Sequence, residues 1–413
     1  MTNASEAGAA ASGVERGARM SPALIITLLA LLLGVQPITT DLYLPALPGL
    51  AAELHAGIGG AQATLSALLF AFGLSQLLLG SMADRFGRRP VLLGGLSLYV
   101  AASAGAAFSS HIDALVGWRA LQGIGVGAAV VCARAMVRDL HQPSEGAGVM
   151  SQALSALGFI VLASPLAGGA LATLFGWRAA LAATGLFGLG CLVLVARVMP
   201  ETARTLNPHA LRAGPMLAMW WRVLSHRVFI AWSLLIACSY GGLFAFLAGS
   251  TFVFIDVLGL SRMACGLVLA ACSVSYIVGT FWCRRWLLRH GLAGAVRRGA
   301  AFSLAGGASM AALAWAGVQS PWAIALPQLV FAFGHGIHQP CGQAAVVGPF
   351  PHHAGTASAL AGFMLAAAAV AVGAWLGVAM DGTVRPLANT IGVMGLATAV
   401  VGWTLVQQHG ESQ

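Results

Sequence analysis

An acidic residue, Asp41, interrupts a long apolar run near the start of the chain. An ionisable side chain in so apolar a segment is costly, and its presence suggests a function by default. A carboxyl group that alternates between dry and hydrated surroundings can take up a proton in one and release it in the other. Asp41 is therefore a candidate proton carrier. The alternative is a solvated or capping acid near the outer end of a helix.

Two histidines, His335 and His338, lie three residues apart, and Gln339 follows them. This spacing puts the two imidazoles on one face of a helix. Imidazole exchanges protons near neutral pH and binds polar ligands. Metal sites usually need more than two ligands, and no third is evident in the sequence, so we expect no metal. Polar lining of a cavity and structural hydrogen bonding both remain open.

A short charged segment at 80–89 joins two apolar runs. Its carboxylate, Asp84, can pair with an arginine or with the positive end of a neighbouring helix, and its glycines allow close contact. Such a cluster could latch one conformation; the alternative is a loop that only sets orientation. The candidate latch residues are Gly80, Asp84, Arg85, Gly87, Arg88 and Arg89.

The composition shows what must position these residues. Of 413 residues, 59% are hydrophobic and 8% are charged, and the mean hydropathy is +0.85. Soluble domains carry about 25% charged residues, so most of this surface must face lipid. Soluble enzymes and secreted domains are excluded. The positive charge lies in short loops, which argues against nucleic acid, and the lack of a P-loop pattern argues against ATP coupling.

Apolar runs of about 20 residues cross a bilayer as helices. The sequence predicts twelve of them, at 23–48, 61–81, 90–109, 114–136, 149–173, 178–199, 227–255, 264–287, 299–317, 321–345, 354–380 and 386–407. Seventeen of the 21 basic residues then fall on the side of the N-terminus and three on the other. By the positive-inside rule, both termini are cytoplasmic.

The longest polar stretch between these runs divides the chain into halves. Secondary transporters are commonly built from repeats, with the substrate site between them. A faint repeat aligns Gly80 with Gly279 and Asp84 with Cys283. We predict an all-α membrane protein with twelve transmembrane helices in two pseudo-symmetric six-helix bundles. Its parts are a cytoplasmic tail (1–20), an N-terminal bundle (21–199), a cytoplasmic linker (200–226), a C-terminal bundle (227–408) and a second tail (409–413).

Several motifs resemble those of the major facilitator superfamily. The charged segment at 80–89 resembles its signature loop, and RALQGIGVGA at 119–128 resembles its fourth-helix motif. DLYLPALP at 41–48 and PFPHHAGTASALAGF at 349–363 are similar to the Bcr/CflA group of bacterial drug:proton antiporters. A fifth-helix segment resembles the antiporter motif through Gly158, Pro165, Gly168 and Gly169.

The resemblance implies a proton-coupled exporter of amphipathic or apolar drugs in the bacterial inner membrane. It would work by alternating access, as a monomer, with no cofactor beyond the proton gradient and no enzymatic activity. A proton-coupled transporter of sugars, amino acids or nucleosides is the alternative. A membrane enzyme would need a nucleophile–base pair or a group of metal ligands, and neither is evident in the sequence beyond His335 and His338. A sensor would be expected to have an appended soluble domain, and none is evident.

The resemblance also implies roles for single residues. Arg119 becomes the partner of Asp41 in proton coupling, unless it lies at the outer interface and snorkels to water. The antiporter motif becomes a flexible contact between the halves, unless it only packs. The expected substrate cavity comprises Tyr43, Gln122, Tyr240, Phe244, His335, His338 and Gln339.

Overall fold

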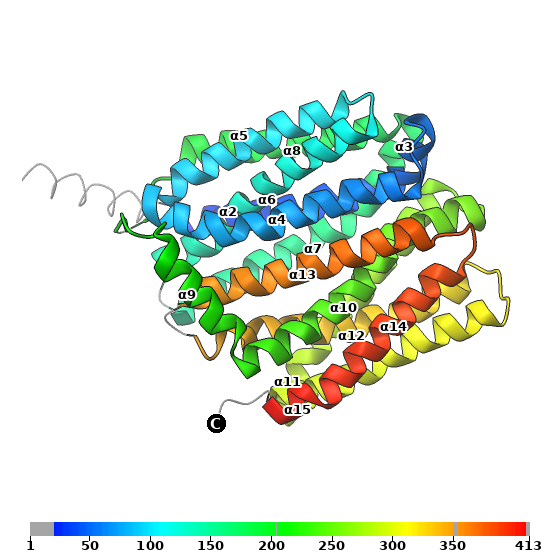
Figure 1. Cartoon of the computed structure of the whole chain (residues 1–413). Coiled ribbons are helices and arrows are strands. Elements are labelled where there is room, and N and C mark those ends of the chain that lie inside the picture. The colour runs from blue at the N-terminus through cyan, green and yellow to red at the C-terminus, as the bar shows by residue number, and fades with distance from the viewer. Residues whose placement is uncertain (1–19, 142, 204, 351–352, 410–413) are drawn as a thin grey trace, which may run out of the picture.

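The computed structural model describes residues 20–409 apart from 142, 204 and 351–352, and all regular structure in that part of the chain is helical (Figure 1). Within these described residues, ten helices are long and apolar enough to cross a membrane. One of them, α11 (Arg262–Trp315), turns at Gly291, whose φ of +66° breaks the helical path, so it contains two crossings. With α12 (Trp322–Val347), which is of spanning length but less apolar, the described chain crosses twelve times.

The helices of the first half are α2 (Pro22–Asp41), the short η1 (Leu44–Ala46) and α3 (Leu47–Glu53), α4 (Ile58–Phe86), α5 (Arg88–Ala107), α6 (Ile112–Leu140), α7 (Pro143–Leu174) and α8 (Trp177–Val198). Those of the second half are α10 (Arg227–Phe252), η2 (Val253–Val257), α11, α12, α13 (Ala354–Ala379), α14 (Arg385–Trp403) and α15 (Leu405–His409). The amphipathic α9 (Ala213–Leu224) lies between them in sequence.

Figure 1 shows the two halves as bundles side by side, with α7 of the first half and α13 of the second half where the bundles meet. Helix α9 crosses one end of the bundle, which we call the linker end, and α3 lies at the opposite end. The predicted fold class, two six-helix bundles, is confirmed.

The predicted first helix, 23–48, is broken. Helix α2 ends at Asp41, a 3₁₀ turn follows, and α3 begins at Leu47. Pro45 and Pro48 lie at the starts of these two elements, where the backbone N–H that proline lacks is not needed for helical hydrogen bonding. The apolar span nevertheless continues to Glu53, so Asp41 lies within it and not at its end.

The buried apolar side chains form one core at the opposite end and two at the linker end. The core at the opposite end includes side chains of both halves, such as Leu65 of α4, Phe252 of α10 and Leu376 of α13. Towards the linker end, the N-terminal half packs around Leu96 and Met136, and the C-terminal half packs around Trp232. The two halves are therefore joined most closely at the end opposite the linker.

Candidate functional site

Asp41 is the last residue of α2, and its carboxylate accepts a hydrogen bond from Thr40 Oγ1 at 2.8 Å. The side chain is partly exposed. The 3₁₀ turn η1, which follows Asp41 closely in the chain, contacts α10 and α11 of the other half. Asp41 thus lies where the two halves meet, so a change in how the halves pack would change the surroundings of its carboxylate.

Arg119 is fully buried in the interior of α6, which rules out snorkelling at the outer interface. Its Nη1 donates to Gln122 Oε1 at 2.6 Å, and its Nη2 donates to the backbone carbonyl of Thr39 at 3.1 Å. The guanidinium lies over the ring of Tyr43, 4.4 Å from its centroid.

The expected ion pair between Arg119 and Asp41 is not formed in this structure, and the part of the chain that it describes offers Arg119 no other carboxylate. The reason lies in how α2 ends. Thr39 is in the last turn of α2, where carbonyl groups lack helical partners and carry partial negative charge. Arg119 binds that helix terminus, and the Tyr43 ring covers the guanidinium by a cation–π contact.

A network of small polar side chains extends from Arg119 through the N-terminal half. Gln122 Nε2 donates to Ser103 Oγ at 2.7 Å and to Thr184 Oγ1 at 3.3 Å. Thr39 Oγ1 and the Tyr99 hydroxyl are 2.7 Å apart. Sequence analysis missed these partners, whose only signal was a hydroxyl group within an apolar run.

The histidine pair converges on one serine. Ser239 Oγ of α10 lies 2.9 Å from Nδ1 of His335 and 3.2 Å from Nδ1 of His338. Both imidazoles are buried, and His335 packs beside the rings of Tyr240 and Tyr276. The described residues contain no group of three metal-ligating side chains. The role of this pair as lining of a substrate cavity stays a prediction.

The other residues expected to line a substrate cavity lie at different depths. Their role as cavity lining stays a prediction. The buried ones are Tyr43, Gln122 and Phe244, and the partly exposed ones are Tyr240 and Gln339.

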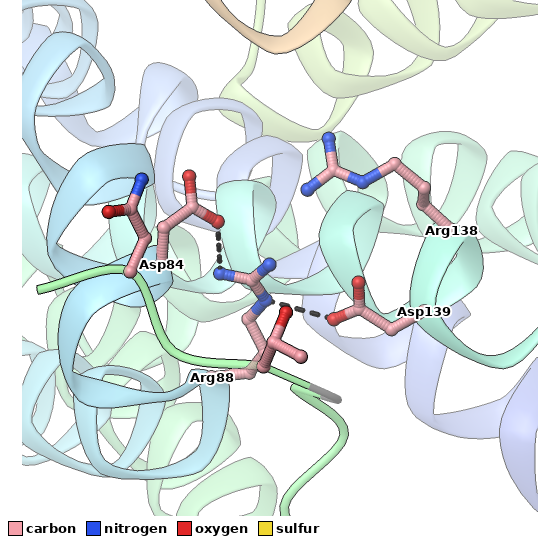
Figure 2. A pocket seen from close by; sticks show the side chains of 6 residues that line it. Asp84, Arg88, Arg138 and Asp139 are labelled. Carbon is pink, nitrogen blue, oxygen red and sulfur yellow. Dashed lines mark hydrogen bonds and ion pairs between the residues drawn. The ribbon is translucent and has the colours of Figure 1, made fainter. Parts of the chain in front are cut away.

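The charged segment forms a cluster within the N-terminal half (Figure 2). Arg88 bridges two carboxylates, with Nη1 2.6 Å from Asp84 Oδ1 and Nε 2.9 Å from Asp139 Oδ2. Asp84 is still helical, because the turn between α4 and α5 consists of Gly87 alone, at φ +99°. All three charged residues belong to α4, α5 and α6, so in this conformation the cluster joins helices of one half to each other.

Glu201 of the linker caps the start of α5. Its carboxylate accepts from the backbone N–H groups of Arg88 and Arg89, at 2.9 and 3.1 Å. The Arg89 side chain reaches the Ala196 carbonyl at 2.9 Å. The roles of Glu201 and of Asp139 were not predicted from the sequence.

Two other residues of the segment make few contacts. The expectation of a tight contact at Gly80 is wrong for this conformation, since a methyl group placed there would meet no atom within 4 Å. The exposed guanidinium of Arg85 lies over the Phe86 ring, 5.2 Å from its centroid.

The second copy of the repeat, which includes Gly279 and Cys283, packs against α12. A methyl group at Gly279 would come within 2.3 Å of the Phe333 carbonyl oxygen, so glycine is required where α11 meets α12. Cys283, in the position of Asp84, is buried with its Sγ 3.4 Å from that of Cys341.

The antiporter segment lies where α7 meets other helices closely. A methyl group at Gly168 would come within 2.1 Å of the Leu42 carbonyl oxygen, and one at Gly169 within 2.9 Å of that of Arg262. On the facing helix, one at Gly266 would lie 2.7 Å from the Pro165 carbonyl oxygen. Gly158 has ordinary contact with Ile277. Because α7 and α11 belong to different halves, this segment is a contact between the halves.

A cavity of about 710 Å³ opens at the linker end between the two halves. Its wall comes from α4, the start of α5, α6, the linker and α9, the end of α12 and the beginning of α13. The opposite end is closed by the shared apolar core and by close helix contacts such as that of Gly59 with Gly377. The structure is therefore open towards the linker side and closed towards the other.

Comparisons with known proteins agree with this architecture. Residues 29–406 match the Major Facilitator Superfamily. Multidrug resistance protein D of Escherichia coli (strain K12) is 31% identical over 340 residues, which are 82% of this chain and 84% of that protein. A bicyclomycin resistance protein homolog of Haemophilus influenzae is 24% identical over 94% of this chain and 98% of its own length. Among solved structures, a D-xylose-proton symporter superimposes with a TM-score of 0.73 at 19% identity, covering 95% of this chain and all of that one.

Proposed function

Since this chain belongs to the major facilitator superfamily, and its resemblance to drug-resistance members is confirmed, we propose that it exports amphipathic or apolar drugs in exchange for protons. The observation that carries the exchange is the position of Asp41, a carboxylate at the end of α2 and beside a turn that contacts the other half. The alternative of a transporter of sugars, amino acids or nucleosides has support only from likeness of fold, which is shared across many functions.

The proposed cycle uses the asymmetry between the two ends. A drug binds from the linker side, which the arginine partition places in the cytoplasm. Closure at the linker end and opening at the other then exposes Asp41 to the periplasm. A proton taken up there neutralises the carboxylate, and the drug leaves. Return to the linker-open state releases the proton inside.

Arg119 supports this cycle without pairing to Asp41. Its charge is compensated by the end of α2, by Gln122 and by the Tyr43 ring. We propose that it fixes the backbone around Asp41, because it binds the Thr39 carbonyl two residues before Asp41 and lies over the Tyr43 ring two residues after it. Arg119 is then a positioning residue, and Asp41 carries the proton.

The energy available is sufficient for export. A membrane potential of ~100 mV is worth about 2.3 kcal/mol per charge, and one pH unit is worth about 1.4 kcal/mol. Exchange of one proton for a neutral drug could thus sustain a concentration ratio of several hundredfold.

The test uses inside-out vesicles with two uncharged antibiotics, chloramphenicol and bicyclomycin. With an imposed pH gradient, the native protein should accumulate at least one of them, and Asp41→Asn should not. Asp113→Asn, which removes an exposed acid at the start of α6, is the matched control and should transport normally. Gradient-driven accumulation by Asp41→Asn would refute the assignment of the proton to this residue.

A further inference from the structure

Three arginines outside the charge cluster line the cavity at the linker end, and two of them, Arg134 and Arg138, belong to α6. Arg134 and Arg138 lie one turn apart on α6, and both side chains are exposed and line the cavity. The one carboxylate in the wall, Asp84, is already paired with Arg88. A site with this imbalance attracts negative charge.

Neither arginine forms an ion pair with a carboxylate in the part of the chain that the structure describes. Arg134 Nη1 donates to a neutral group, Ser358 Oγ, at 3.3 Å. The guanidinium of Arg138 projects into the space beside the cluster, and no dashed line joins it to Asp84 or Asp139 (Figure 2). Its Nη1 lies 3.7 Å from where a methyl group on Gly355 would be.

The helix that faces these arginines adds more positive potential. Ser358 and Gly355 belong to the first turns of α13, a 26-residue helix whose N-terminus has no side-chain cap. A helix N-terminus carries partial positive charge and favours anions, whereas cations are stabilised near C-termini. Two guanidinium groups beside this terminus are unfavourable unless an anion joins them.

The rest of the wall suits an apolar body. Leu77 of α4, Val131 of α6 and Val347 of α12 line the cavity, and Met219 and Trp220 of α9 cover it from the linker. A ligand that fits both parts has an anionic group at one end and an apolar ring system at the other.

We propose that Arg134 and Arg138 bind the carboxylate, sulfonate or phosphate group of an amphipathic organic anion entering from the linker side. The proposal rests on the proposed export function, and it extends the substrate class from neutral drugs to anionic ones. The two guanidinium groups supply charge-assisted hydrogen bonds, and the first turn of α13 supplies backbone donors.

Binding to the purified chain in phosphatidylcholine nanodiscs tests the proposal by equilibrium dialysis. Naphthalene-2-sulfonate is the anionic probe, and its neutral sulfonamide is the analogue of the same shape. Arg134→Gln and Arg138→Gln should each weaken sulfonate binding about tenfold, since each variant loses one charge-assisted hydrogen bond to the anion. Sulfonamide binding should change less than about twofold.

Arg297→Gln is the control, because Arg297 is an exposed arginine of α11 outside the cavity wall. It should leave both affinities unchanged. Equal affinity of the native protein for the two probes would overturn the proposal. So would equal loss of both probes in the cavity variants, which indicates damaged structure.

A lipid headgroup is the other source of an anionic group, and nanodiscs containing phosphatidylglycerol separate the two. Sulfonate binding that survives this lipid supports a substrate site, whereas displacement of the sulfonate from the native protein would assign the arginines to lipid and overturn the proposal. Dialysis needs no pH gradient, so failure of drug accumulation in vesicles would refute the export function and leave this result standing.

Discussion

Arg88 holds two carboxylates of unequal burial, and replacing each with asparagine separates the stability of the charge cluster from its role in transport. The Arg88 side chain is 7% exposed, that of Asp139 is 12% exposed, and that of Asp84 is 45% exposed. Removing one partner of a fully buried pair costs about 3–5 kcal/mol, whereas an exposed pair contributes about 0–1 kcal/mol.

The pair of Arg88 with Asp139 is close to the buried case, and the pair of Arg88 with Asp84 is close to the exposed case. Asp139→Asn should lower the free energy of unfolding by roughly 2 kcal/mol, because Arg88 keeps only its exposed partner. Asp84→Asn should cost less than about 1 kcal/mol, since water already screens that pair. The order should be reversed for transport. Asp84 lines the cavity and can leave Arg88 when the linker end closes, so its loss should impair transport more.

Thermal unfolding of the purified variants, followed by tryptophan fluorescence, gives the first order. Drug accumulation in vesicles, normalised to the amount of inserted protein, gives the second. If Asp84→Asn is the less stable variant, burial does not rank these pairs and the reasoning fails. If it transports at the native rate, the cluster is only structural.

Three further predictions follow from single contacts. Arg119→Leu should insert into the membrane but lose pH-driven transport. Arg119→Lys should restore transport only partly, because an ammonium group cannot bind the Thr39 carbonyl and Gln122 in the same geometry. Transport by Arg119→Leu at the native rate would refute this prediction. Gly169→Leu should block transport with near-normal folding, because the side chain would force α7 from α11 at the opposite end; crosslinking between the helices measures the separation. Ser239→Ala should lower the unfolding free energy by about 1–3 kcal/mol, because it leaves both imidazoles without this partner, and an unchanged melting temperature would contradict it.

The helices were predictable because apolar runs report lipid contact directly. Their ends were less so. The predicted helix 61–81 extends over Ile58–Phe86, since charged residues near a helix end were taken for loop although Gly87 alone makes the turn. The break in the first helix follows from Pro45 and Pro48, which a count of apolar residues does not register.

The partners of the candidate residues were less predictable than the residues themselves. Asp41 and Arg119 could be found because charge is rare in such segments, but Arg119 binds a backbone carbonyl and neutral side chains, which leave no mark in a sequence. Glu201 caps α5 from 113 residues away, and only the folded chain brings the two together. Ser239 was hidden for the same reason.

Buried polar groups at the closed end of the bundle oppose the apolar packing that keeps it closed. Where α4 meets α13 across the halves, a methyl group at Gly373 would lie 2.4 Å from Ser66 Oγ. Among the residues that the structure describes, neither polar atom of the buried Gln62 side chain has a hydrogen-bond partner. Within the same described residues, the buried hydroxyls of Ser250 and Thr251 on α10 also have none. An unpaired buried polar group costs about 1–3 kcal/mol, which opposes the apolar packing of the shared core. Water entering when this end opens would satisfy these groups, so the open state regains part of what it loses in apolar contact. A gradient of ~100 mV and one pH unit can drive a change only between conformations that differ by a few kcal/mol, and these polar groups bring the closed and open states closer in free energy.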